Sequence, residues 1–266
     1  MSRAAVVGAI LRVGFKEAIA YRAELFVWIL STTMPLVMLA LFSAVARDAP
    51  LGPYGEHEFL AYFLATFIVR QVTGSWAAWQ INVDVRQGTL ATKLLRPVHP
   101  LLTYGLETLA SIPVRFALAV PVALVALLVL ARDRLTTNPW LWLCLPVSLL
   151  GAWLITLLIN FAVGCLAFFV DSSARVMDIY LAAYFVFSGY LIPVDLFPAR
   201  FKGALDLLPF RYQIGLPVDI LTARYDLSPS AVLGPLALQW LWVAIVGGLA
   251  TVSWRRGIKH FGAFGG

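Results

Sequence analysis

The sequence predicts an all-α membrane protein with six membrane-spanning helices, organised as one domain over residues 1–266. Of the 266 residues, 61% are hydrophobic and only 13% are charged. A soluble domain carries charge on about a quarter of its residues. The apolar residues form runs long enough to cross a bilayer, which takes about 20 residues in a helix. Such a chain is solvated by lipid.

Residues 1–24 predict a basic amphipathic helix that lies at the membrane interface. Arg12, Lys16 and Arg22 fall among apolar residues at helical spacing, as in helices that rest among lipid headgroups. The predicted spans follow, and Pro35 should bend the first. The apolar run of the fifth is short for a crossing, so we start that span near residue 173. The six runs are 25–46, 59–81, 113–130, 140–170, 179–192 and 232–254.

Residues 82–102 form a polar, basic break between the second and third spans. Val85, Leu90 and Leu94 stand at helical spacings, which predicts a short amphipathic helix. Pro97 then ends it, because proline cannot continue the backbone ladder. Two interpretations are open. The positive charge either only fixes the topology of the chain, or the helix is a lever on which a soluble partner acts.

Residues 193–230 predict two short helices that dip into the outer leaflet before the last span. Asp195 stands where it could cap a helix that starts at Pro198. A second amphipathic piece covers residues 212–221. A free loop would not need so many large apolar side chains, so we interpret the segment as an extracytoplasmic re-entrant hairpin.

The distribution of Lys and Arg predicts a multi-pass protein of the cell membrane with both termini in the cytoplasm. Most basic residues outside the spans fall on the inner side when the N-terminus is placed there, as the positive-inside rule requires. The net charge of +6 therefore follows from topology and does not predict a nucleic-acid partner.

A few polar residues within the spans are the candidates for function. A charged side chain at the bilayer centre costs about 2.5–3.5 kcal/mol on insertion scales, which makes Arg70 the strongest, with Gln71 beside it. These residues either line a substrate path or dimer interface, or are structural and satisfied by a neighbouring span. Asn160 suits helix packing or substrate contact, and Tyr184 belongs to an aromatic cluster that could line a cavity. Arg115 is expected only to snorkel towards the cytoplasm.

Enzyme chemistry is not expected from this chain. The sequence contains no H-E-x-x-H, no G-x-S-x-G and no G-x-x-x-x-G-K-[ST]. We expect no catalytic residue, no metal site and no cofactor bound by the chain itself. Cys144 and Cys165 lie in apolar runs and are expected to be packing residues.

The layout and two local stretches resemble the membrane subunits of type-2 ABC exporters. The stretch DVRQGTLATKLLRP at 84–97 resembles the cytosolic coupling loop of that family. SGYLIPVDLFP at 188–198, followed by LLPFRY at 207–212, resembles the turn where the fifth span meets the outer re-entrant helices. The resemblance extends over nearly the whole chain.

The resemblance implies a permease subunit of an exporter, and an apolar, aromatic interior with few charges suits an amphiphilic substrate. The subunit would pair with a second permease subunit and dock soluble ABC ATPase subunits, which would bind the ATP and magnesium. An ATP-independent secondary carrier or a lipid-handling membrane protein remains the alternative. Leu90 and Leu94 would be the apolar knobs of the coupling helix, and its candidate residues are Asp84, Arg86, Gly88, Leu90, Lys93, Leu94 and Arg96.

Overall fold

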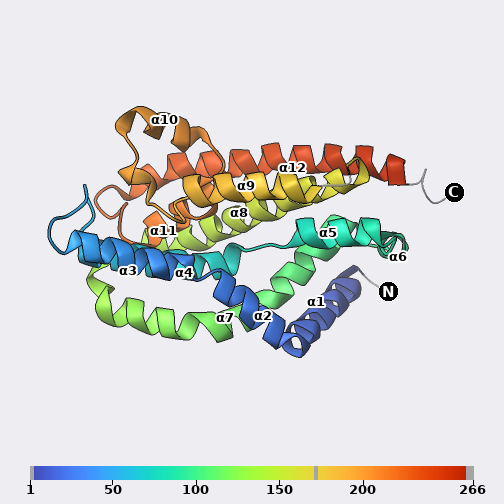
Figure 1. Ribbon diagram of the computed structural model, residues 1–266, viewed down its shortest axis with the longest axis horizontal. Helices are drawn as coiled ribbons and strands as arrows, with labels where there is room; N and C mark the ends of the chain where they lie inside the picture. Colours follow the sequence, from blue (N-terminus) through green and yellow to red (C-terminus); the bar gives the residue numbers. More distant parts are fainter. Residues whose placement is uncertain (1–2, 171–172, 262–266) are drawn as a thin grey trace.

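The computed structural model describes residues 3–170 and 173–261, and every regular element in these ranges is helical (Figure 1). The all-α prediction is confirmed for this part of the chain. The elements are α1 Arg3–Ala20, α2 Arg22–Ser31, α3 Met34–Ala46, α4 Glu56–Thr73, α5 Ala77–Arg86, α6 Leu90–Leu94, α7 Pro100–Leu130, η1 Arg132–Arg134, α8 Pro139–Gly164, η2 Cys165–Phe168, α9 Ser173–Phe187, η3 Val194–Leu196, α10 Ala199–Leu207, η4 Arg211–Gln213, α11 Gly215–Leu221, η5 Pro229–Val232 and α12 Leu233–Phe261.

Within the described residues, four helical segments are long and apolar enough to cross a membrane. The helices α4 and α9, which form part of the second and fifth predicted spans, do not reach that standard. α4 carries Glu56, Glu58 and Arg70, and α9 has 15 residues, a length of about 22 Å against a hydrocarbon core of about 30 Å. Six crossings therefore remain a prediction. The four segments are Arg22–Ala46, Pro100–Leu130, Pro139–Phe168 and Pro229–Phe261.

The first and second predicted spans are both interrupted. α2 and α3 are separate helices around Thr32 and Thr33, and Pro35 stands in the first turn of α3, so the predicted bend is confirmed. The second span is not the single helix expected over 59–81. α4 ends at Thr73, Gly74 is extended with φ −64° and ψ 137°, and α5 begins at Ala77.

α8 is the central helix of the bundle. Most of its apolar window is buried, whereas the other three candidate spans expose most of theirs. α12 packs along it through Gln239, whose Nε2 donates to the carbonyl oxygens of Ser148 at 2.9 Å and Tyr212 at 2.8 Å. Gly151 makes room for this amide, since a Cβ there would lie 2.8 Å from its Cδ. The contact joins α8, α12 and η4.

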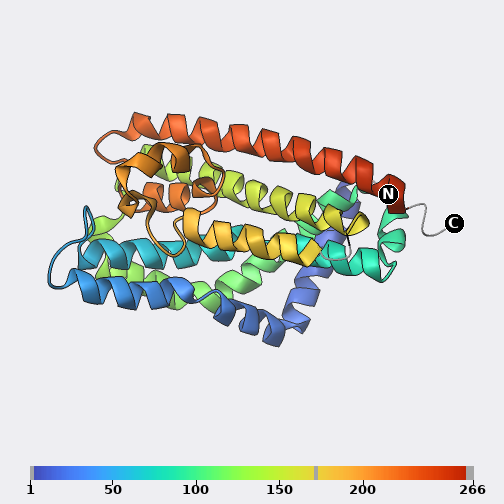
Figure 2. The ribbon, with the colours of Figure 1, turned by 45° about the horizontal axis from the view of Figure 1, so that its top comes forward.

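The two ends of the bundle differ in character. Figures 1 and 2 show α6, the start of α1 and the end of α12 at one end, and α10 and α11 at the other. Every residue of α11 is buried, and the helix packs on α8 and α4. The predicted cap by Asp195 is wrong. Pro198 is the N-cap of α10, and the Asp195 carboxylate instead accepts a hydrogen bond of 3.4 Å from the Tyr54 hydroxyl.

Candidate functional site

Asp84 organises the loop between α5 and α7. Its carboxylate accepts from Lys93 Nζ at 2.7 Å, the Tyr104 hydroxyl at 2.6 Å and Thr89 Oγ1 at 2.7 Å. Burial acts to raise the pKa of Asp84, but these donors outweigh it and hold the pKa below its usual value. Lys93 also lies 3.8 Å from the Glu107 carboxylate and 4.2 Å above the Tyr104 ring. Asp84 and Lys93 therefore clamp the loop onto α7.

The prediction of one amphipathic helix that contains Val85, Leu90 and Leu94 is wrong. α5 ends at Arg86, and the chain turns at Gly88, where φ is +73°, a left-handed value that costs glycine little. α6 then has only five residues. This turn sends Leu90 into the protein, where it is fully buried in a cluster that includes Tyr104 and Phe161. Leu90 is thus a core residue in this conformation and is not available as a knob for a partner.

The outer face of this loop is exposed and basic. Arg86 and Arg96 are exposed, Leu94 is 39% exposed and Leu95 is 87% exposed. The structure thus divides the candidate coupling residues into two groups. Asp84, Leu90 and Lys93 hold the loop in place, whereas Arg86, Leu94 and Arg96, joined by Leu95, form what we call the outer face of the loop. The role of this face in coupling remains a prediction.

Arg70 is buried near the end of α4. It is 7% exposed and lies over the Tyr184 ring, with 5.2 Å between its Cζ and the ring centroid. Within the described residues no carboxylate lies within ion-pair distance of Arg70, and its Nε has no hydrogen-bond partner. A carboxylate partner, one of the two structural possibilities for Arg70 beside backbone carbonyls, is therefore not found in this part of the chain, and the choice between a structural and a functional Arg70 remains a prediction.

Two small cavities, each with space for about one water molecule, meet at Arg70. One is lined by Gln71 together with residues of α2 and Arg115, and Gln71 Nε2 also donates to Thr32 Oγ1 at 3.1 Å. The other is lined by Asn160 and Tyr184. The four path candidates named from the sequence thus gather around one point. Their contact with substrate or with a second subunit remains a prediction.

Arg115 does not snorkel towards the cytoplasm. It is 6% exposed, and it donates to the carbonyl oxygens of Gly74 at 3.2 Å and Thr108 at 3.3 Å. The Gly74 acceptor belongs to the segment between α4 and α5 and lies 41 positions away in sequence. A local pattern of residues does not show that contact. A Cβ on Gly74 would lie 3.1 Å from Arg115 Nη1 and 3.5 Å from Arg70 Nη1, so the two guanidinium groups flank one residue.

A polar seam joins α8 to the hairpin region. Gln213 Oε1 accepts from Thr156 Oγ1 at 3.1 Å and from the Tyr180 hydroxyl at 2.6 Å. Asn160 Nδ2 donates to the Thr156 carbonyl at 2.9 Å, and its Oδ1 has no partner. The bond of Asn160 lies within α8, so the choice between helix packing and substrate contact for this residue remains a prediction.

A second charged cluster lies beneath the hairpin at the other end of the bundle, outside the four candidate spans. Arg211 pairs with Asp206 and, through Nη2 at 3.3 Å, with Asp219 of α11. Asp219 is 7% exposed. Burial raises its pKa to about 6 although Arg211 favours the charged form.

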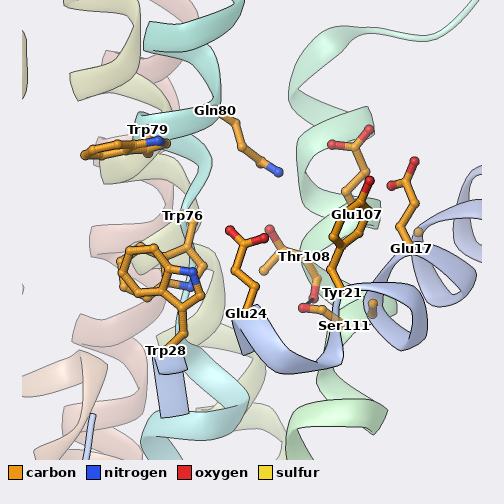
Figure 3. Close-up of a pocket in the computed structure, with 12 residues that line it drawn as sticks. Glu17, Tyr21, Glu24, Trp28, Trp76, Trp79, Gln80, Glu107, Thr108 and Ser111 are labelled. Carbon is orange, nitrogen blue, oxygen red and sulfur yellow. Dashed lines mark hydrogen bonds between the residues drawn. The ribbon is translucent and has the colours of Figure 1, made fainter. Parts of the chain in front are cut away.

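The sequence reasoning missed a larger cavity between α1, α2, α5 and α7. It has a volume of about 270 Å³, and aromatic and acidic side chains line it (Figure 3). These residues come from four separate helices, so their convergence could not be seen in any one segment. No group of three or more His, Cys, Asp or Glu suited to a metal ion occurs among the described residues.

The comparison with known families decides the class of protein. Residues 26–265 match the family model described as ABC-2 family transporter protein. The chain belongs to the ABC-2 transporter family. A comparison with curated proteins gives no significant match. The resemblance found from the sequence is thereby confirmed at the level of the family.

Membership in the ABC-2 family gives the chain its general role. It is a multi-pass membrane protein and the permease subunit of an ABC transporter, not the catalytic subunit. Members of the family work with ABC ATPase subunits. A role as the permease subunit agrees with the lack of a phosphate-binding loop in the sequence.

Proposed function

We propose that this permease exports an amphiphilic substrate, as one of two membrane subunits driven by separate ATPase subunits on the cytoplasmic face. It crosses the membrane six times with both termini inside, and the hairpin of α10 and α11 dips into the outer leaflet. The common position of α6 and the two ends of the described chain (Figures 1 and 2) supports placing both termini on the side of α6, because an even number of crossings returns the termini to one side.

The outer face of the loop is the proposed contact with the ATPase. Force passes only through elements that hold their shape. The Asp84–Lys93 ion pair of 2.7 Å joins α5 to α6, and the Tyr104 hydroxyl, which donates to Asp84 at 2.6 Å, ties this pair to α7. Leu95 is 87% exposed, which suits an apolar group that enters a partner's groove. Arg86 and Arg96 then select the orientation by charge complementarity. ATP and magnesium are bound by the partner.

The test is co-purification of an ATPase with the native permease and its variants. Truncating a central interface residue costs about 2 kcal/mol or more, so Leu95→Asp should weaken association about thirtyfold or more. Leu207→Asp is the matched control, because Leu207 is an equally apolar, 64% exposed side chain of α10 at the other end of the bundle. Leu90→Asp would test only folding, since Leu90 is buried.

Salt supplies a second arm of the same test. Arg86→Glu should weaken the complex, and the effect should shrink at high ionic strength because exposed charges are screened beyond about 10 Å at 0.1 M salt. If native permease brings no ATPase with it under any salt condition, an ATP-independent carrier or lipid-handling protein becomes the better interpretation. Normal ATPase binding by Leu95→Asp would instead move the contact elsewhere.

A further inference from the structure

The cavity between α1, α2, α5 and α7 has an unusual lining. Three tryptophans form one wall, and Tyr21 and carboxylates face them across the opening, with Glu24 rising in the middle (Figure 3). Trp28 and Trp76 pack with their ring centroids 4.3 Å apart. The twelve lining residues are Gly14, Glu17, Ala18, Tyr21, Glu24, Trp28, Trp76, Trp79, Gln80, Glu107, Thr108 and Ser111.

Charge in this cavity is of one sign. Glu17, Glu24 and Glu107 contribute carboxylates, and no Lys, Arg or His lines it. Lys93 approaches Glu107 from outside at 3.8 Å. In the described part of the chain Glu17 and Glu24 form no ion pair. The charges of Glu17 and Glu24 are thus not offset by an ion pair in this part of the chain.

Aromatic faces and carboxylates together favour one class of ligand. The face of an indole ring attracts a cation, most strongly for tryptophan, and aromatic cages recognise quaternary ammonium groups in this way. Carboxylates add a Coulombic attraction, which water weakens at the exposed Glu17 and Glu24 and which is stronger at the part-buried Glu107. We propose that this cavity is a binding site for an organic cation, such as a quaternary ammonium or aromatic cationic amphiphile. It rests on the proposed export function and names the substrate class.

The position of the cavity gives its role in transport. It lies in the half of the molecule that holds α6, the start of α1 and the end of α12 (Figures 1 and 2), which is the proposed cytoplasmic side. Trp76 also lines the two small cavities at Arg70. The buried arginines beyond Trp76 repel a cation in this conformation, so the cavity is an entry site. Moving one positive charge out of a cell costs about 2.3 kcal/mol per 100 mV of membrane potential, which ATP hydrolysis would supply.

The test is calorimetric titration of the purified permease, without ATPase, in maltoside micelles. The probe is benzyltrimethylammonium, and benzenesulfonate is the anionic control. Saturable binding of the cation alone is expected. Glu17→Gln with Glu24→Gln should weaken it about tenfold, taking about two- to fivefold for each partly exposed charge. Trp79→Ala should weaken it about two- to fivefold, the range for an exposed cation–π contact. Trp79 is 66% exposed, so the fold should survive.

The control variant removes the same charge at the other end of the bundle. Glu56→Gln with Asp133→Asn should bind the probe as the native protein does, because neither residue lines the cavity. Equal binding by the Glu17/Glu24 variant and this control, or no saturable binding of the cation, would overturn the proposal. Co-purification with an ATPase is measured separately. A permease that binds the cation but no ATPase would refute only the exporter function, and one that binds an ATPase but no cation would refute only the cation site.

A lipid headgroup carrying choline offers the same cation as a free solute. Dihexanoylphosphatidylcholine, kept monomeric, is therefore added as a competitor, with the matching phosphatidylglycerol as control. Displacement of the probe by the choline lipid alone supports the cation site and assigns it to a lipid. Failure of both lipids to displace the probe supports the site and assigns it to a free cation.

Discussion

The hydrogen bonds and ion pair of Asp84 make the most direct prediction about the loop between α5 and α7. Asp84 is 13% exposed and Lys93 is 17% exposed as side chains, and three donors converge on one carboxylate. Hydrogen bonds to a charged group contribute about 1.5–3 kcal/mol each, and removing one partner of a buried pair costs about 3–5 kcal/mol. Because this pair is partly exposed, we expect Asp84→Ala to cost about 3 kcal/mol.

That loss should appear as local opening of residues 86–99, since α5 and α7 remain packed in the bundle. A change of about 3 kcal/mol raises the open population about 100-fold. When opening is fast relative to cleavage, the rate of proteolysis follows that population. Trypsin should therefore cut after Arg86 and Lys93 about 100 times faster in the Asp84→Ala variant than in the native protein. Mass spectrometry would measure the rate of cleavage at each of these two peptide bonds.

Two further variants bracket this prediction. Tyr104→Phe removes a single donor to Asp84, and one such bond of about 1.4 kcal/mol corresponds to about tenfold faster cleavage. Asp133→Ala removes an exposed carboxylate at the far end of the bundle, 64% exposed beside Arg134, and should leave the rate unchanged. Cleavage of Asp84→Ala at the native rate would refute the idea that this network holds the loop.

Three other predictions follow from buried charge and sidedness. Arg70→Ala should impair transport with ATPase association intact, measured on the same membranes, and unaltered transport would leave Arg70 a structural residue. Asp219 has a raised pKa in the folded protein, so the free energy of unfolding should fall as pH rises from about 4 through 6, by up to about 3 kcal/mol. The melting temperature of Asp219→Asn should not show this fall. The same pH dependence of melting in the native protein and the variant would argue against the prediction. Cysteine at Gly203 should react with an impermeant thiol reagent from outside and cysteine at Thr92 should not, and the reverse labelling would invert the topology.

The sequence was a good guide wherever local periodicity carries the signal. Apolar runs placed a helix in each predicted span, and Pro35 marked a real interruption of the first. The large apolar side chains of 193–230 correctly indicated ordered short helices. These features depend on residues close together in the chain, so hydropathy and proline chemistry are sufficient to find them.

Features that depend on distant contacts were missed. Leu90 looked like an exposed knob because its spacing matched Leu94, yet the turn at Gly88 and the anchor on Tyr104 fold it inward. The aromatic cavity needs four helices to bring its lining together. In both cases the decisive contact joins residues of different helices. The spacing of apolar residues within one segment does not predict such a contact.

The break between α4 and α5 shows why the second span is not one helix. A buried arginine needs acceptors, and a continuous helix would commit the Gly74 carbonyl to its own ladder. The break frees that oxygen, and Arg115 binds it at 3.2 Å. Irregular backbone within the membrane is tolerated where it is buried in protein or lines a cavity. Trp76, two residues after Gly74, lines three cavities. The break therefore accommodates a buried charge and shapes the proposed path together, so a substitution at Gly74 should alter both.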